Sequence, residues 1–213
     1  MARASRAQIA EALSQADPAI GRLLEIIGAP PARSSLKVQD RFAMLARAIL
    51  HQQLATKAAA TISGRVADAL GGTITAAGLL DVEPGILRAC GVSGAKEAAL
   101  GDLASRVVDG RLDLAGFARH SDHEVIADLV AVRGIGQWTA EMFLMGPLGR
   151  HDIWPVGDLG VRKGWALIRR QSVANPRDLL DAADHLRPYR SSVAWACWRA
   201  VDVTREGDGS LPR

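Results

Sequence analysis

Helix signals recur along the 213-residue chain and constrain its fold more than any other feature of the sequence. Asp17 and Pro18 stand in the order of an N-cap and a first helical residue, and Gly28 follows as a stop signal. Further along, Ser121 and Glu124 have the spacing of a capping box. No segment shows the polar and apolar alternation between hairpin turns that marks a strand. The sequence therefore predicts an all-α fold.

The composition limits the kind of protein. A chain of this length that is 48% hydrophobic can bury a sizeable core, as one domain or as two small lobes that share a cleft. No apolar stretch reaches the roughly 18 residues of a membrane span, and the first residues lack the apolar core of a signal peptide. We therefore expect a cytoplasmic protein with no membrane partner. Its net charge of +3 fits a nucleic-acid partner without demanding one.

The stretch LVAVRGIGQWTAEMFL places a glycine-framed turn between two apolar runs that both have a helical pattern. Gly134 and Gly136, one residue apart, allow a tight reversal in which Ile135 packs inward. Amide groups at the start of the second helix would then form an anion site suited to one phosphate. An ordinary αα-hairpin is the alternative, because a glycine pair between helices is a common arrangement.

A longer string favours the phosphate site. The segments VRGIGQWTAEMFLM and DIWPVGDLGVRKG together resemble the helix-hairpin-helix (HhH-GPD) DNA glycosylase superfamily, and within it the alkylbase group of 3-methyladenine DNA glycosylase II. Further likenesses follow the family's order, in AILHQQLATKAAATI, LRACGVSGAKEAALGDLA and RPYRSSVAWACWR. The resemblance implies a base excision repair enzyme that flips an alkylated base out of duplex DNA and hydrolyses its N-glycosidic bond.

We expect the chain to form two helical lobes with the active-site cleft between them. Residues 1–37 would supply an N-terminal helix and a linker that pack with the C-terminal lobe. Residues 38–150 would form a helical domain that ends in the helix-hairpin-helix. Residues 151–213 would form the C-terminal lobe, which carries the catalytic aspartate that the resemblance implies.

Asp158 is the candidate catalytic residue. Taken alone, it is an ordinary N-cap before LGVRKGWAL. The resemblance implies that its carboxylate faces the flipped nucleotide and stabilises the positive charge that develops on the sugar. An alkylated base is cationic or electron-poor and leaves readily, so a fixed anion can suffice without a strong general acid. Asp152, a second carboxylate nearby in sequence, is interpreted as supporting or structural.

A pocket for a cationic purine benefits from aromatic faces. By resemblance, Trp138 and Trp198 match pocket aromatics of the family, and Trp154 and Tyr189 are further candidates. Met142 shares a helix face with Trp138 and stands where some relatives have an aromatic residue. Core packing is the alternative for each of them.

Two segments are candidate DNA contacts. The corner at QQLAT resembles the place from which the family inserts a side chain into the gap left by the flipped base, and Gln53 and Leu54 are the candidates. Their alternative roles are a polar helix end and a core leucine. Around the hairpin, the candidate contacts to the DNA backbone are Gly134, Gly136, Gln137, Trp138 and Thr139. In the family, hairpin carbonyls can also bind a monovalent cation, here those of Val130, Val132 and Ile135.

The resemblance also predicts absences. Bifunctional members carry a lysine just after the hairpin, where this chain has Trp138, so we expect a monofunctional hydrolase that leaves an abasic site. Cys90 and Cys197 are too few for an iron–sulfur cluster and are expected to be buried thiols. We expect no cofactor, no catalytic metal and a monomer.

Two other functions remain open at this stage. One is a non-catalytic helix-hairpin-helix protein that binds DNA structure, which leaves the aspartate of PVGD unexplained. The other is a glycosylase for oxidised or deaminated bases. The ranking among alkylated bases depends on the dimensions of the pocket.

Overall fold

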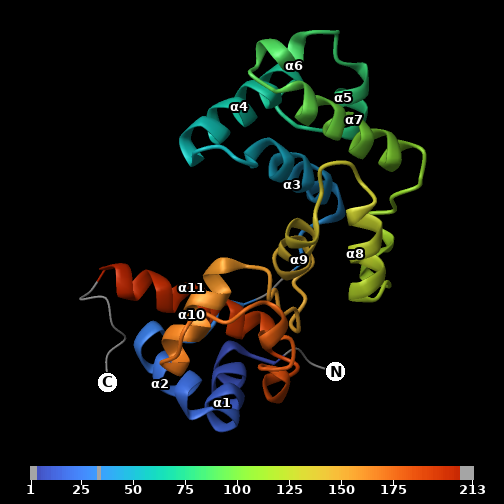
Figure 1. The fold of residues 1–213 in the computed structure, drawn as a ribbon. Helices are drawn as coiled ribbons and strands as arrows, with labels where there is room; N and C mark the ends of the chain where they lie inside the picture. Colours follow the sequence, from blue (N-terminus) through green and yellow to red (C-terminus); the bar gives the residue numbers. More distant parts are fainter. Residues whose placement is uncertain (1–3, 33–34, 207–213) are drawn as a thin grey trace. The chain divides into compact units, whose positions relative to one another are not determined.

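The computed structural model describes residues 4–32 and 35–206, and its regular structure there is entirely helical, as the sequence predicted. Figure 1 shows the α-helices in chain order. They are α1 (Arg6–Ala16), α2 (Pro18–Ile27), α3 (Val38–His51), α4 (Thr56–Ala69), α5 (Ala76–Asp81), α6 (Ile86–Ala89), α7 (Gly94–Val108), α8 (Asp122–Val130), α9 (Gln137–Met145), α10 (Leu159–Arg169) and α11 (Arg190–Glu206). Three short 3-10 helices, η1 (Gly116–Ala118), η2 (Arg177–Leu179) and η3 (Asp184–Leu186), complete the described elements.

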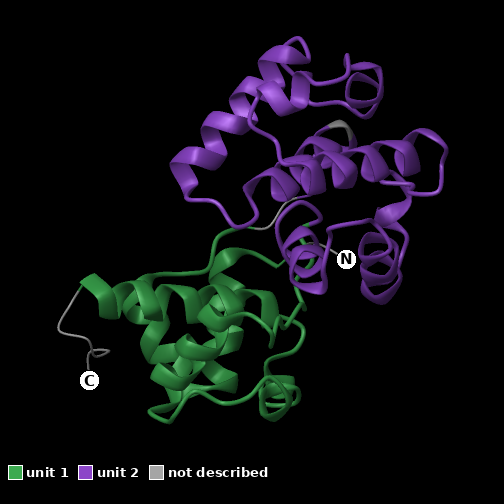
Figure 2. Ribbon diagram, turned by 45° about the horizontal axis from the view of Figure 1, so that its top comes forward, with its two compact units in different colours: residues 1–34, 149–213 green, residues 35–148 purple. Residues whose placement is uncertain are grey.

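The chain divides into two compact units, coloured separately in Figure 2. Unit 1 combines both ends of the chain, residues 1–34 and 149–213, and contains α1, α2, α10 and α11. Unit 2 is continuous, residues 35–148, and contains α3 to α9. Residues 33 and 34 of the predicted linker lie outside the described residues. Over the described part of the chain, each helix is too short or too polar to cross a membrane.

Unit 1 is built around Asp17, which ends α1 and caps α2. Its side chain accepts hydrogen bonds from the amides of Ala19 and Ile20, which confirms the predicted cap. The same buried carboxylate pairs with Arg169 of α10 and with His185 of η3. One side chain therefore ties the N-terminal helices to the C-terminal part of the unit.

Unit 2 holds the predicted corner and the predicted hairpin. α3 ends at His51 and α4 begins at Thr56, so the corner falls at the expected place. The sequence suggested Thr56 as the N-cap, but the cap is Ala55, which offers no side-chain hydrogen bond. At the start of α8, Ser121 and Glu124 form the predicted capping box. α7 packs against α3 and α5 within this unit (Figure 1).

Candidate functional site

The hairpin between α8 and α9 has the predicted form. Gly134 adopts a φ of 80°, in the region that favours glycine, and a Cβ there would lie 3.1 Å from the Cβ of Ala99. Ile135 is buried, as expected of an inward-packed residue. Gly136 is the N-cap of α9. Because glycine has no side chain, the first amides of α9 receive no side-chain cap. The start of α9 thus has the exposed position that the predicted phosphate site requires, with Gln137 and Trp138 exposed beside it.

The carbonyls considered for a cation lie around the same turn. Val130 is the last residue of α8, and Val132 and Ile135 are in the turn itself. The Val132 carbonyl accepts the Ile135 amide at 3.1 Å. A carbonyl oxygen has two lone pairs, so this bond still leaves it able to accept a second partner.

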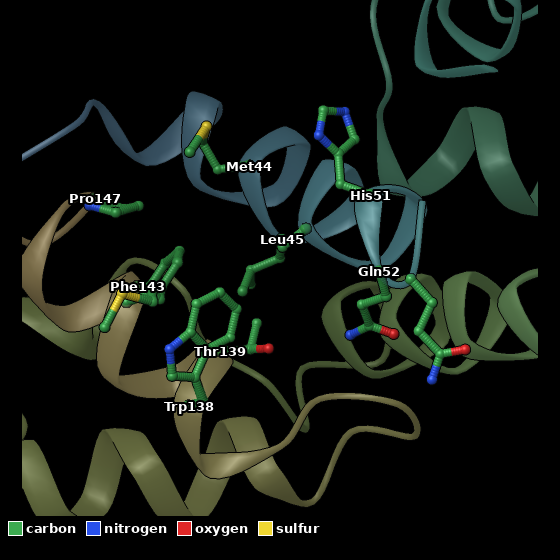
Figure 3. Close-up of a pocket in the computed structure, with 11 residues that line it drawn as sticks. Met44, Leu45, His51, Gln52, Trp138, Thr139, Phe143 and Pro147 are labelled. Atoms are coloured by element: carbon green, nitrogen blue, oxygen red, sulfur yellow. The ribbon is translucent and has the colours of Figure 1, made fainter. Parts of the chain in front are cut away.

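Beside the hairpin, unit 2 contains an apolar cavity of about 350 Å³, shown in Figure 3. From the predicted set, the cavity brings together Trp138, Thr139, Met142 and Gln53. The sequence reasoning missed its other lining residues, which are Met44, Leu45, Ala48, His51, Gln52, Phe143 and Pro147. None of the described residues that line it is Asp, Glu, Lys or Arg. The cavity can therefore hold a flat, apolar or cationic group by contact rather than by ion pairing.

Two large apolar residues of this region are exposed. Trp138 is 52% exposed, so part of its indole ring remains available to a ligand. Leu54, at the corner, is 39% exposed and does not line the cavity, which leaves this large apolar side chain in contact with solvent.

Asp158 lies in unit 1, where it caps α10. Its Oδ1 accepts the amide of Val161 at 2.8 Å and the indole N–H of Trp198 at 2.9 Å. The residue is half-buried, between exposed Gly157 and exposed Leu159. The capping interpretation is thus correct in structural terms, and it leaves the carboxylate at an open helix end rather than inside the core.

Two glycines explain how Trp198 reaches this carboxylate. Gly160 and Gly164 are four residues apart and share one face of α10. A Cβ on Gly164 would lie 2.0 Å from the carbonyl oxygen of Cys197, so only glycine allows α11 to approach this closely. A Cβ on Gly160 would lie 2.8 Å from Cδ1 of Trp198 and 3.0 Å from Oδ1 of Asp158. No sequence motif predicted this close contact between α10 and α11, because its residues lie on two different helices.

The remaining predicted aromatics lie elsewhere. Trp154 is packed in the core of unit 1, at 67° to the ring of Trp165 with centroids 5.3 Å apart. Its indole N–H donates to the Leu179 carbonyl at 2.8 Å, so this donor is used within the core. These contacts favour core packing, the alternative to a pocket wall, for Trp154. Tyr189 is half-buried just before α11 and does not line the cavity of unit 2.

Asp152 has a structural role, as the sequence suggested. Its carboxylate accepts hydrogen bonds from Arg187 at 2.7 Å and from Arg190 at 2.8 Å. These bonds hold the segment that leads into α11. Cys90 and Cys197 are both buried thiols, and burial raises the pKa of Cys197, which keeps that thiol protonated.

Comparison of this chain with known proteins identifies one family. Residues 46–182 match the HhH-GPD superfamily of base excision DNA repair proteins. "DNA-3-methyladenine glycosylase 1" of Schizosaccharomyces pombe is 31% identical over 191 residues, which are 88% of this chain and 84% of that protein.

Solved structures agree with this match. The S. pombe 3-methyladenine DNA glycosylase in complex with abasic DNA has a TM-score of 0.79 at 30% identity, over 91% of this chain and 96% of that one. A DNA-3-methyladenine glycosidase from Bacillus halodurans has a TM-score of 0.86 at 31% identity, over 95% of this chain and 93% of that one.

The chain therefore belongs to the HhH-GPD superfamily of base excision DNA repair proteins, as the hairpin string predicted. Within that class it is a DNA glycosylase of the alkylbase group, because its relatives at about 31% identity over most of the chain are enzymes of that group. This finding argues against a helix-hairpin-helix protein without catalytic activity.

Proposed function

We propose that this glycosylase releases alkylated purines from duplex DNA, 3-methyladenine foremost, and leaves an abasic site. The observation that carries the proposal is the carboxylate of Asp158, fixed at an open helix end by two hydrogen bonds to one oxygen. The names of its relatives, which are 3-methyladenine glycosylases, support the choice of substrate.

Asp158 supplies the chemistry in this proposal. Breaking the N-glycosidic bond of an alkylated purine places positive charge on the sugar, and a preorganised anion stabilises that charge without reorganising. The amide of Val161 and the indole of Trp198 fix one carboxylate oxygen, which reduces the freedom of the whole group. The carboxylate can also orient the water that completes hydrolysis.

The cavity of unit 2 receives the base in this proposal. Its volume of about 350 Å³ accommodates a purine, and the open indole of Trp138 offers a face for stacking and cation–π attraction. A cationic methylated purine gains most from such a wall. Because the base is already a good leaving group, the absence of Asp, Glu, Lys and Arg from the described lining does not impede its release.

The hairpin and the corner handle the DNA. The amide end of α9, after Gly136, binds a phosphate of the damaged strand. Gln53 or Leu54 fills the gap that the flipped base leaves, and both side chains are exposed at the corner. A weakly paired lesion is extruded at a lower cost than a normal base, so selection begins before the base reaches the cavity.

The reaction is monofunctional. A lyase needs an amine that attacks the sugar, and Trp138 occupies the position where bifunctional relatives have a lysine. Lys96, a half-buried amine of unit 2, donates to the carbonyls of Leu50 and Gln52 and is engaged there. Borohydride trapping should therefore yield no covalent DNA complex.

The proposal is tested by incubating the protein at low salt with methylated, oxidised and deaminated duplexes and measuring the released bases. Low salt favours binding, because phosphate contacts weaken as salt rises. We expect release of 3-methyladenine and other alkylpurines, an abasic product and no strand cleavage. Release from oxidised duplexes alone, or none at all, would reject the proposal.

We also propose that the protein acts as a monomer in the cytoplasm, on chromosomal DNA. Light scattering of the free protein and of its complex with a short duplex tests the first point. Cell fractionation tests the second.

A further inference from the structure

The corner between α3 and α4 holds an uncommon backbone conformation. Gln53 has a φ of 55°, in the left-handed region that non-glycine residues rarely adopt. Such a conformation persists only where the surrounding structure enforces it. The corner is therefore held in place by its neighbours rather than by the preference of its own residues.

Lys96 of α7 is one of those neighbours. Its Nζ donates to the carbonyl of Leu50 at 2.7 Å and to the carbonyl of Gln52 at 2.8 Å, at the C-terminal end of α3. A cation is favourable there because helix carbonyls lack partners and the helix dipole is negative. Since the second carbonyl belongs to the peptide that precedes Gln53, Lys96 fixes the point at which the backbone enters its left-handed turn.

The same corner is tied to the hairpin. The side-chain amide of Gln52 donates to the carbonyl of Gly134 at 2.8 Å. On the other side of that turn, the backbone amide of Arg133 donates to Asp102 of α7 at 2.8 Å. Asp102 is itself held by Arg106 at 2.9 Å.

One helix thus contacts both loops. Lys96 and Asp102 are six residues apart on α7, and between them Ala99 lies against Gly134, where an added Cβ would come within 3.1 Å. We call Lys96, Gln52 and Asp102 the α7 brace. All its members belong to unit 2, so the brace is internal to one compact body.

We propose that the α7 brace is a positioning device for base extrusion, which fixes the corner that carries Gln53 and Leu54 at a set distance from the hairpin that grips the phosphate. This inference rests on the proposed function. A side chain can enter the base stack only if the corner that carries it keeps its position while the stacked bases oppose the insertion. Without the hydrogen bonds of the α7 brace, the corner could move away from the DNA. A displacement of the inserted side chain by about 1 Å can lower the rate about 100-fold.

The inference predicts a dependence on the DNA substrate. A methylated base in a duplex must be pushed out of its stack, whereas a base in a single strand has no partner strand to leave. Lys96→Met, which removes the charge and keeps an unbranched stem, should slow base release from the duplex about 10-fold or more. Release from the same strand without its complement should stay at the wild-type rate. Asp102→Ala, which removes the acceptor of the Arg133 amide, should show the same split, and Lys96→Arg should recover part of the duplex rate.

The experiment measures single-turnover base release from both substrates, with circular dichroism to confirm folding. Lys37→Met is the matched control: Lys37 lies exposed in the same unit and makes no capping hydrogen bond, so both rates should be retained. Equal losses on duplex and single strand would assign Lys96 a purely structural role and overturn the brace. Unchanged rates on both would also overturn it.

A second readout separates the brace from the chemistry. The fluorescence of 2-aminopurine placed beside an abasic site should rise when the wild-type protein binds and rise less with Lys96→Met or Asp102→Ala. If the wild type releases no base from either substrate, the proposed function fails, and this fluorescence alone then decides the brace. An equal rise for wild type and both variants would overturn it. If Lys96→Met does not fold, Asp102→Ala carries the test.

Discussion

The two units each present a tryptophan at a candidate site, and they use it in different ways. In unit 1 the edge of Trp198 donates its N–H to Asp158, and Gly160 leaves the room for that approach. In unit 2 Trp138 is 52% exposed and lines an apolar cavity. The family resemblance had suggested a pocket wall for both, with core packing as the alternative. The comparison teaches that the neighbouring backbone, rather than the residue type, decides whether an indole serves as a hydrogen-bond donor or as a cavity wall.

This difference has a kinetic consequence. A group that acts on developing charge changes the rate of the chemical step, whereas a group that stacks on the base changes binding in the ground state as well. We therefore expect variants of unit 1 to act on the single-turnover rate constant and variants of the unit 2 cavity to act on affinity too. The following predictions run from the largest expected effect to the smallest.

Asp158→Asn should slow base release about 1000-fold, by analogy with the loss of a preorganised electrostatic contact. Asparagine is a good N-cap, so α10 should keep its start and the variant should fold. Single-turnover release from methylated duplex measures the effect. A variant as active as the wild type would remove the catalytic role from this carboxylate.

Trp138→Ala should weaken base release about 10- to 100-fold, the cost of losing one aromatic stacking partner. The loss should appear at low DNA concentration and shrink as the DNA approaches saturation. Trp138→Phe should retain most of the activity, because it keeps an aromatic face. If the phenylalanine variant were as poor as the alanine variant, stacking would not be the contribution of Trp138.

Trp198→Phe should behave in the opposite manner. It keeps an aromatic ring but loses the N–H that Asp158 accepts at 2.9 Å, and hydrogen bonds to charged groups are among the stronger ones. We expect about a 10-fold fall in the rate constant at saturating DNA. If Trp138→Phe and Trp198→Phe lowered the rate constant equally, the two tryptophans would not differ in role as described.

Gly160→Ala should slow the chemical step about fivefold, because the added methyl must displace Trp198 or Asp158 and small misplacements reduce rate. Gly64→Ala in α4 is the matched control, since a Cβ there meets nothing within 4 Å. The control should be neutral or slightly stabilising, as alanine favours helix. Single-turnover rates and thermal melts of both variants distinguish a displaced Trp198 or Asp158 from a loss of folding.

Asp17→Asn should destabilise unit 1 without slowing the reaction of the folded enzyme. Burial opposes ionisation of Asp17, but hydrogen bonds from Arg169 and His185 outweigh it and lower its pKa. Since the folded pKa lies below the unfolded value of about 3.9, the contribution to stability is complete above that pH. It is lost as the pH falls through the folded pKa.

We expect a loss of about 2 kcal/mol at pH 7, less than the roughly 3 to 5 kcal/mol for one partner of a fully buried pair. Asparagine retains the cap, and Arg169 and His185 are partly exposed, which reduces the cost. Urea unfolding of wild type and variant at pH 7 and near pH 3 measures the difference. A gap that widened at low pH would contradict the assignment.

Local chemistry explains what the sequence could predict. The cap at Asp17, the capping box at Ser121 and the buried Ile135 all depend on residues close in sequence. The family resemblance supplied Asp158, which periodicity alone would leave as a helix cap. Residues brought together from distant helices were out of reach, because no short-range rule records them. Trp198 and Asp158 are 40 residues apart, and Gly164 meets α11 through its backbone.

Trp154 shows the limit of reading a role from residue type. As one of five tryptophans in a chain that is 4% aromatic, it stood out as a pocket candidate. Its packing against Trp165 and its hydrogen bond to Leu179 instead place it in the core. Rarity of a residue type does not separate a stacking surface from a large core filler, because both depend on burying the same ring.

The central claim is that unit 1 supplies the catalytic charge while unit 2 holds the DNA. Binding of Asp158→Asn to duplex that contains an abasic site tests it most directly, since no base release can intervene. Removing an anion near the DNA backbone should leave the affinity equal to wild type or higher. The same protein should be nearly inactive in base release. A loss of affinity as large as the loss of rate would contradict the account, because Asp158 would then act through binding or folding rather than through chemistry.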